Sequence, residues 1–518
     1  MKNLLFPILL AMYVHSLSGQ QPDSLFSLDE LTYNSVFEKD AVYDFFHSEN
    51  PDYLSLFIAS SGKTSLADYQ KIRDNYTSFY QKLNTKKLKT NSEPKKIKTI
   101  YKTVHDQYFK KYELKTKFGE IFSSGNFNCV TASALYAIIL NDMGVPFIVK
   151  ETPVHVYLVA YPDVKNIKIE STDPLDGYYY YDQRGKTSFI DYLLKNKLIS
   201  EEEYRNSQPD EIFNKYFYSD KDIHLRELLG LHYLNQGVYK IMDKNLKEGY
   251  NELEKAYVFY PSERVRFLLL STLSELINNQ NYTEPEYIQY LAKVARFRNY
   301  GARPEDIQNE FIRITNYHLI NRSNVAYYDS VYNYLISNIQ DDEINNEINF
   351  IYYFEKGRFF YAKGMNQAAH ECFSGAYLIK PKNSDAQAAF VQSLALSLNN
   401  CQPAVAVKTI EDYYENDSSL ENNQLFKKLL LHAYLVGAHQ SYSLNQPAKG
   451  DSYISRFESM CESDEGIELL QDVVGEAYTS ASVYYFRKGN ISKARELISR
   501  GLKYAPGNFQ LIMSQQSF

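Results

Sequence analysis

The sequence of 518 residues lacks tryptophan altogether, although it contains 48 tyrosines and 30 phenylalanines. Cysteine is also scarce. So few cysteines exclude a small fold that depends on a network of disulfides. Three of the four lie in the C-terminal half, so the one in the N-terminal half is expected to be a free thiol. The four are Cys129, Cys372, Cys401 and Cys461.

An excess of positive charge is absent as well, because the formal net charge is -7. This balance is typical of a globular protein and argues against nucleic acid as a partner. Beyond the N-terminus no apolar run approaches the roughly 20 residues that span a bilayer, so we expect no transmembrane segment in the mature chain. Histidines such as His105, His224 and His232 are scattered singly. We therefore expect no metal site and no cofactor.

The first 19 residues have the pattern of a secretory signal peptide. Met1–Asn3 supplies a positive charge, Leu4–Val14 is apolar, and Ser16–Gly19 provides small residues for cleavage. The alternative is a buried first helix. No cysteine follows the apolar run, so nothing indicates lipid attachment. The pattern predicts an exported protein that is periplasmic or extracellular after removal of residues 1–19.

Apolar residues at three- and four-residue spacing predict helices over Leu66–Tyr80 and Ile97–Tyr112. The polar stretch Asn84–Lys96 separates them. A solvated loop and helix face is the expected role of the lysines in this region, rather than contact with an anionic surface. These lysines are Lys86, Lys87, Lys89, Lys95, Lys96 and Lys98.

From about residue 221 the sequence is helical in character and contains an internal repeat. Relative to Gly364, small residues stand at -7, +5 and +12, aromatic residues at -4 and +9, and proline at +17. This is the spacing of a 34-residue tetratricopeptide repeat. The same frame recurs at Gly489 and, more loosely, at Lys244. We expect divergent helix pairs between them to complete a solenoid that binds a protein partner, with an unrelated helical bundle as the alternative.

The segment that carries candidate chemistry begins at Cys129. Asn128 suits a helix N-cap, while Gly144 and Pro146 suit a helix end, which together predict a helix over Cys129–Asp142. A thiol in the first turn lies at the positive end of the helix dipole and near unpaired backbone N–H groups. We therefore expect a lowered thiol pKa and donors for an oxyanion, although a structural thiol is the plainer interpretation.

Two alternating segments follow, over 154–161 and 167–172, and predict a β-hairpin. Val156 and Leu158 then share the buried face with Ile169, because residues two apart point the same way. This register places His155 on the opposite face together with Glu170. Glu170 can orient the imidazole, as a cysteine–histidine pair requires, whereas Asp173 reaches that face only if the strand bends or ends.

This order of residues resembles the transglutaminase-like superfamily of papain-like cysteine enzymes. The resemblance covers roughly residues 118–182 and rests on three motifs, Asn128–Ala132, Pro153–Val156 and Glu170–Thr172. It implies Cys129 as nucleophile, His155 as general base and acid, and Glu170 or Asp173 as the orienting carboxylate of a catalytic triad. It further allows Asn126 or the Cys129 backbone N–H as oxyanion donor. The chain departs from the family in lacking its aromatic neighbour, often tryptophan, and in having glutamate where many members have aspartate.

Together these observations predict an α+β transglutaminase-like domain with N-terminal helices over residues 20–220. An all-α tetratricopeptide-type solenoid is predicted to follow over residues 221–518. The expected function is acyl transfer from an amide, with Cys129 forming a thioester that passes to water or to an amine. The alternative is a catalytically silent scaffold for protein–protein interaction.

Overall fold

The computed structural model describes residues 25–62, 64–152, 155–162, 164–171, 183–195, 198–217, 221–279, 285–463 and 470–517. The chain forms two compact units, Met1–Ile307 and Gln308–Phe518, called unit 1 and unit 2 below. The predicted signal peptide and Asp173 lie outside the described residues.

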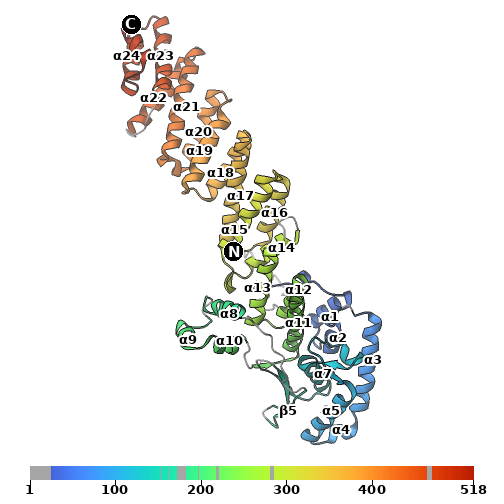
Figure 1. The fold of residues 1–518 in the computed structure, drawn as a ribbon. Coiled ribbons are helices and arrows are strands. Elements are labelled where there is room, and N and C mark those ends of the chain that lie inside the picture. The colour runs from blue at the N-terminus through green and yellow to red at the C-terminus, as the bar shows by residue number, and fades with distance from the viewer. Residues whose placement is uncertain are drawn as a thin grey trace, which may run out of the picture. The chain divides into compact units, whose positions relative to one another are not determined.

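Unit 1 consists mainly of helices that surround a small sheet (Figure 1). Its helices are η1 Leu28–Glu30, α1 Val36–His47, α2 Tyr53–Ala59, α3 Leu66–Leu83, α4 Lys86–Thr90, α5 Glu93–Tyr108, α6 Glu120–Ser123, α7 Cys129–Asp142, α8 Gln183–Lys195, α9 Glu201–Asn206, α10 Pro209–Phe217, α11 Leu225–Met242, α12 Leu246–Phe259, α13 Glu263–Asn279, α14 Pro285–Ala295 and η2 Arg298–Tyr300. Its strands are β1 Lys111–Tyr112, β2 Asn126–Phe127, β3 Phe147–Glu151, β4 Val156–Ala160, β5 Ile167–Ile169 and β6 Lys221–Ile223.

Helix α7 is the core of unit 1 and begins and ends at the predicted residues. Every residue from Val130 to Leu140 is buried. The helix packs against β3 and β4 of a four-stranded antiparallel sheet with the order β5-β4-β3-β6, and against α11. A helix buried on all sides needs apolar or small residues around its whole circumference, which explains its run of Ala, Leu and Ile.

The predicted α+β fold class is wrong. Helices account for 75% of the structure and strands for only 4%, so the described residues form no sizeable α+β domain. Toward the end of the predicted α+β domain, the described residues between 183 and 217 form helices α8, α9 and α10. Phe189 and Leu193 of α8 are four residues apart and both are fully buried, and the adjacent Ile212 and Phe213 of α10 are buried as well. This burial fits the helical period and not the alternation of a strand.

Unit 2 is all-helical within the described residues and stacks its helices in series (Figure 1). From α15, which spans the division between the units, its elements are α15 Pro304–Ile314, the π-helical η3 Thr315–Asn321, α16 Val325–Asn338, α17 Asp342–Ala362, α18 Asn366–Ile379, α19 Ser384–Leu398, α20 Pro403–Asn416, η4 Ser418–Asn422, α21 Gln424–Ser443, α22 Pro447–Ser463, α23 Gln471–Arg487, α24 Ile491–Tyr504 and α25 Phe509–Ser517.

The repeat frames mark turns of one geometry. Lys244, Gly364 and Gly489 all have positive φ, of 65°, 72° and 81°. In each turn the N–H of this residue donates to the carbonyl three residues earlier in the chain. The N–H of the following residue donates to the carbonyl five residues before that following residue. Asn445, with φ 57°, forms a fourth such turn between α21 and α22. This repeat-like helical architecture is compatible with the predicted repeats.

Small residues allow the paired helices to approach closely, as the repeat frame predicts. A Cβ added to Gly357 of α17 would lie 2.7 Å from the Phe373 ring of α18, and one added to Gly237 of α11 would lie 3.0 Å from the Gly249 carbonyl of α12. None of the described helices combines the length and the apolar character needed to cross a membrane.

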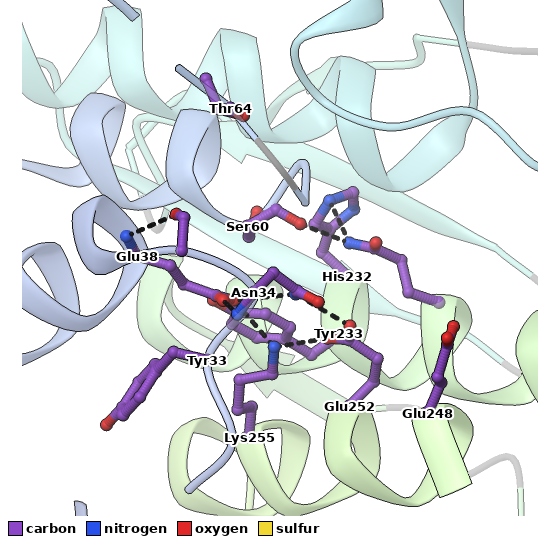
Figure 2. Close-up of polar contacts among 12 residues, drawn as sticks. Tyr33, Asn34, Glu38, Ser60, Thr64, His232, Tyr233, Glu248, Glu252 and Lys255 are labelled. Carbon is purple, nitrogen blue, oxygen red and sulfur yellow. Dashed lines mark hydrogen bonds and ion pairs between the residues drawn. The ribbon is translucent and has the colours of Figure 1, made fainter. Parts of the chain in front are cut away.

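A buried network of charges joins the N-terminal helices to α11 and α12 (Figure 2). Lys255 Nζ lies 2.8 Å from Glu38 Oε1 and 2.9 Å from Glu252 Oε2, and all three side chains are at most 1% exposed. Tyr233 donates to Glu38 at 3.0 Å, and Asn34 donates to Glu252 at 3.0 Å. Burial alone would lower the pKa of Lys255, but the carboxylates of Glu252 and Glu38 outweigh it and leave that pKa raised.

Candidate active site

Cys129 is the first residue of α7, because a capping box formed by Asn128 and Thr131 fixes the helix start there. Asn128 accepts a 2.9 Å hydrogen bond from the Thr131 N–H, and Thr131 Oγ1 accepts one of 2.9 Å from the Asn128 N–H. The Asn128 amide also donates to the Leu114 carbonyl at 3.0 Å. Cys129 itself is a free thiol on a partly buried residue. The local sequence therefore positions this thiol firmly.

Burial of the thiol raises the pKa of Cys129 to about 11. The backbone N–H groups of Val156, Val130 and Cys129 itself act in the opposite direction, and the carboxylate of Glu170 adds to the increase. The expectation of a lowered thiol pKa is therefore wrong: the predicted N–H groups are present, but desolvation of the thiolate outweighs them. The thiol is neutral at pH 7.

His155 directly precedes β4, and Thr152 directly follows β3. Thr152 fixes His155, because its N–H and its hydroxyl donate to the His155 carbonyl at 2.8 and 2.9 Å, while its hydroxyl also accepts from the His155 N–H at 3.1 Å. The His155 side chain is 8% exposed, and its Nε2 is paired with Oε1 of Glu170. Nδ1 is then the ring nitrogen left for a reacting group.

Strand register explains why Glu170 meets His155. Leu158 pairs with Ile169 and Val159 with Lys168, so Glu170 follows the last ladder position of β5 beside the start of β4. Val156, Leu158 and Ile169 are buried, which confirms the predicted faces of the hairpin. Of the two predicted carboxylates, Glu170 is hydrogen-bonded to the His155 imidazole. Asp173 lies outside the described residues.

Lys168 and Tyr157 extend the site beyond the predicted residues. Lys168 Nζ lies 2.9 Å from Oε2 of Glu170 and 4.3 Å from the centre of the Tyr157 ring. The Tyr157 and His155 rings are nearly parallel, with centroids 6.5 Å apart. The sequence signal for this group was the alternation itself, because residues 155, 157, 168 and 170 share one face of the hairpin.

The start of β4 joins the thiol to the imidazole. Val156, whose N–H acts on the Cys129 sulfur, directly follows His155 in the chain. The hydroxyl of Ser133, one turn further along α7, donates to the Val156 carbonyl at 3.3 Å and so attaches this strand to the helix. Among the residues that the structure describes, no hydrogen bond joins the Cys129 thiol to the His155 ring.

The two predicted oxyanion donors differ in placement. The backbone N–H of Cys129 acts directly on the thiol. Asn126 lies in β2, where its partner in the short parallel pairing is Lys111 of β1. The pKa of Tyr112, the other residue of β1, is raised chiefly by burial and further by the charge of an ionised Cys129. Tyr112 therefore also lies near the thiol. The backbone N–H is therefore the better placed donor.

Across the described ranges, no group of three or more His, Cys, Asp or Glu side chains is arranged to hold a metal ion.

Comparison of the chain with protein-family models and with curated proteins gives no match. The interpretation of the site therefore depends on its own geometry.

Proposed function

We propose that the protein is a cysteine-dependent acyl-transfer enzyme that acts on an amide. The observation that carries this proposal is the orientation of His155 by Glu170, directly beside the residue whose N–H lies at the Cys129 thiol. A nucleophile, a base and a group that orients the base are the three parts this chemistry needs. The class includes peptidases, amidases and transglutaminase-like enzymes.

In this mechanism Cys129 Sγ attacks the amide carbonyl carbon while the thiol proton passes to Nδ1 of His155. The proton transfer accompanies the attack, because a thiol with a pKa of about 11 is not ionised beforehand at neutral pH. The carbonyl oxygen accepts hydrogen bonds from backbone N–H groups at the start of α7. His155 then protonates the leaving amine, the C–N bond breaks, and a thioester forms on Cys129.

The second half of the reaction restores the thiol. Water or an amine attacks the thioester carbonyl, His155 accepts a proton from the attacking group, and Cys129 leaves and regains a proton. Glu170 stabilises the imidazolium in both halves and Lys168 holds the second oxygen of Glu170. With water as the acceptor the protein is a peptidase or amidase, and with an amine as the acceptor it is a cross-linking enzyme.

In this proposal the helical repeats supply a surface for the protein substrate or partner. The predicted export implies that the reaction takes place in the cell envelope.

A peptidyl acrylamide that mimics an amide substrate tests this proposal, with modification of each cysteine followed by peptide mass mapping. We expect Cys129 to react faster than Cys401, the exposed thiol that serves as internal control. His155→Ala should slow Cys129 by at least about 100-fold and leave Cys401 unchanged. Equal reactivity of the two cysteines, unaffected by His155→Ala, would remove the catalytic proposal.

A catalytically silent scaffold for protein–protein interaction is the second candidate. Two observations favour it, the raised pKa of the Cys129 thiol and the lack of a described hydrogen bond between this thiol and His155. The scaffold predicts partner binding of equal affinity in wild type and Cys129→Ala, together with no His155-dependent labelling. An enzyme predicts labelling that depends on His155, whether or not a partner is bound.

A further inference from the structure

A surface formed by the end of α3, by α4 and by α5 carries charge of one sign. Residues 82–102 contain eight lysines, no arginine and a single acidic residue, Glu93, in a chain whose net charge is -7. Seven of the lysines are exposed and Lys96 is partly exposed. These residues, called the lysine surface, are Lys82, Lys86, Lys87, Lys89, Lys95, Lys96, Lys98 and Lys102.

The lysine surface is a structured part of unit 1. Leu88 of α4 is buried, as are Ile97, Ile100 and Val104 of α5, so both helices direct their apolar residues inward. The α5 face packs on the core, where Tyr101 stacks on Tyr136 of α7 with ring centroids 5.7 Å apart. Helices α4 and α5 contact each other and lie side by side (Figure 1). The lysines are consequently held on the outward face.

These lysines form no ion pairs within the described residues, unlike many others in the chain. No carboxylate of the described residues forms an ion pair with any of the eight, whereas Lys240 and Lys356 each have one at 2.7 Å. Lys95, Lys98 and Lys102 are three and four residues apart on α5, a spacing at which like charges repel and destabilise a helix. An external anion would relieve this repulsion.

We propose that the lysine surface binds the face of an anionic lipid bilayer. Clusters of this size are attracted to anionic headgroups without a specific pocket. Lysine presents a compact, mobile charge and not the planar fork of arginine, which fits a diffuse layer of headgroups better than one fixed phosphate. Within residues 82–102 the exposed large apolar side chain is Tyr101, which is 36% exposed and stacks on Tyr136, so attraction acts mainly through charge.

The distribution of charge favours a bilayer over a long flexible polyanion. Residues 82–102 have a net charge of +7 and the whole chain -7, so the rest of the molecule is strongly acidic. A bilayer meets one face of the protein at a time, whereas a flexible polyanion also encounters the acidic remainder. This proposal departs from the expectation that the lysines are only solvated, and it is independent of the proposed catalysis.

Co-sedimentation of the full chain with vesicles tests the proposal. Vesicles of phosphatidylcholine with about one third phosphatidylglycerol should bind the protein, with affinity that falls steeply as salt rises. The triple variant Lys95→Gln, Lys98→Gln, Lys102→Gln should bind about 100-fold more weakly, since each lysine contributes about fivefold. The matched control Lys165→Gln, Lys382→Gln, Lys408→Gln removes equal charge from exposed positions elsewhere and should bind like wild type.

Three outcomes would overturn the proposal. The first is equal binding to vesicles of phosphatidylcholine alone, and the second is an equal loss in both triple variants, which would indicate a general charge effect. The third is tight, salt-sensitive binding of heparin by a protein that ignores the anionic vesicles, which would assign the surface to a polyanion. Circular dichroism of both variants verifies that they are folded.

Discussion

The two units bury different kinds of side chain. The buried charged residues of the described chain, Glu38, Glu151, Glu252, Glu254 and Lys255, all lie in unit 1. In unit 2 the buried polar groups are hydroxyl, amide and imidazole side chains, set in a core of aromatic and aliphatic residues. Unit 1 therefore depends on exact pairing of charges, which is costly to break, whereas unit 2 depends on packing that each helix pair repeats.

The largest expected effect comes from breaking the buried network of unit 1. Lys255→Met leaves the carboxylates of Glu38 and Glu252 buried without their shared cation. We expect the free energy of unfolding of unit 1 to fall by about 3–5 kcal/mol. Arg500→Met is the control in unit 2, because its pairing with Glu458 is partly exposed and should contribute about 1 kcal/mol or less. Hydrogen exchange of α12 and α24 in increasing urea measures the loss of stability in each unit. Equal losses in the two variants would contradict the proposed difference between the units.

A change in packing should affect unit 2 next most strongly. Gly357→Ala places a methyl group against the Phe373 ring, which is buried and has little room to move. We expect a loss of about 1–3 kcal/mol, measured by the same exchange experiment on α17 and α18. Gly364→Asn is the matched control, since its turn has open space and asparagine accepts positive φ. A larger loss in Gly364→Asn would show that turn geometry outweighs helix contact.

Acid should weaken unit 1 through its paired carboxylates. Burial would raise the pKa of Glu30, but hydrogen bonds from Arg296 and Ser27 lower it to about 2, against an ordinary value of 4.5. Such a group stabilises the fold above its ordinary pKa and loses this contribution as the pH falls toward about 2. Because Glu30 is partly exposed, we expect about 1 kcal/mol, visible as lower thermal stability at pH 3 than at pH 6. Glu30→Gln should reduce the difference in thermal stability between pH 3 and pH 6 by this amount. An unchanged difference would contradict the assigned role of Glu30.

The smallest effect is expected at Lys168, where the same contrast between buried and exposed pairing recurs inside the candidate site. Its side chain is 56% exposed, whereas that of His155 is 8% exposed. Lys168→Met should slow acrylamide labelling of Cys129 only about two- to fivefold, and Lys168→Arg should restore most of it. A loss as large as that of His155→Ala would show that Lys168 is essential for holding Glu170.

Local signals in the sequence predicted the elements that local interactions determine. The bounds of α7 follow from Asn128 and from Gly144, whose effects reach only a few residues. The turns at Gly364 and Gly489 were found because the small, aromatic and proline residues of the repeat frame stand at fixed distances around them. Asn445 forms the same turn but was missed as a repeat frame, since Phe457 and Glu462 stand where the frame expects a small residue and proline.

Tertiary interactions decided what the sequence could not predict. Glu38 and Lys255 are 217 positions apart, so no local pattern indicates their pairing. The pairing of His155 with Glu170 followed from strand register, yet the thiol pKa depends on how completely the surrounding chain removes water from Cys129. The fold class was wrong because helices, among them α8, α9 and α10 near the end of the predicted α+β domain, outweigh the small sheets.

The pH profile of Cys129 modification tests the central claim most directly. The rate of peptidyl acrylamide labelling should be compared between wild type and His155→Ala from pH 5 to pH 11, with Cys401 as internal reference. If His155 acts as the base, wild type already reacts at neutral pH, whereas His155→Ala reacts only as the pH approaches the thiol pKa of about 11. Two superimposable profiles that both rise only toward pH 11 would contradict the account.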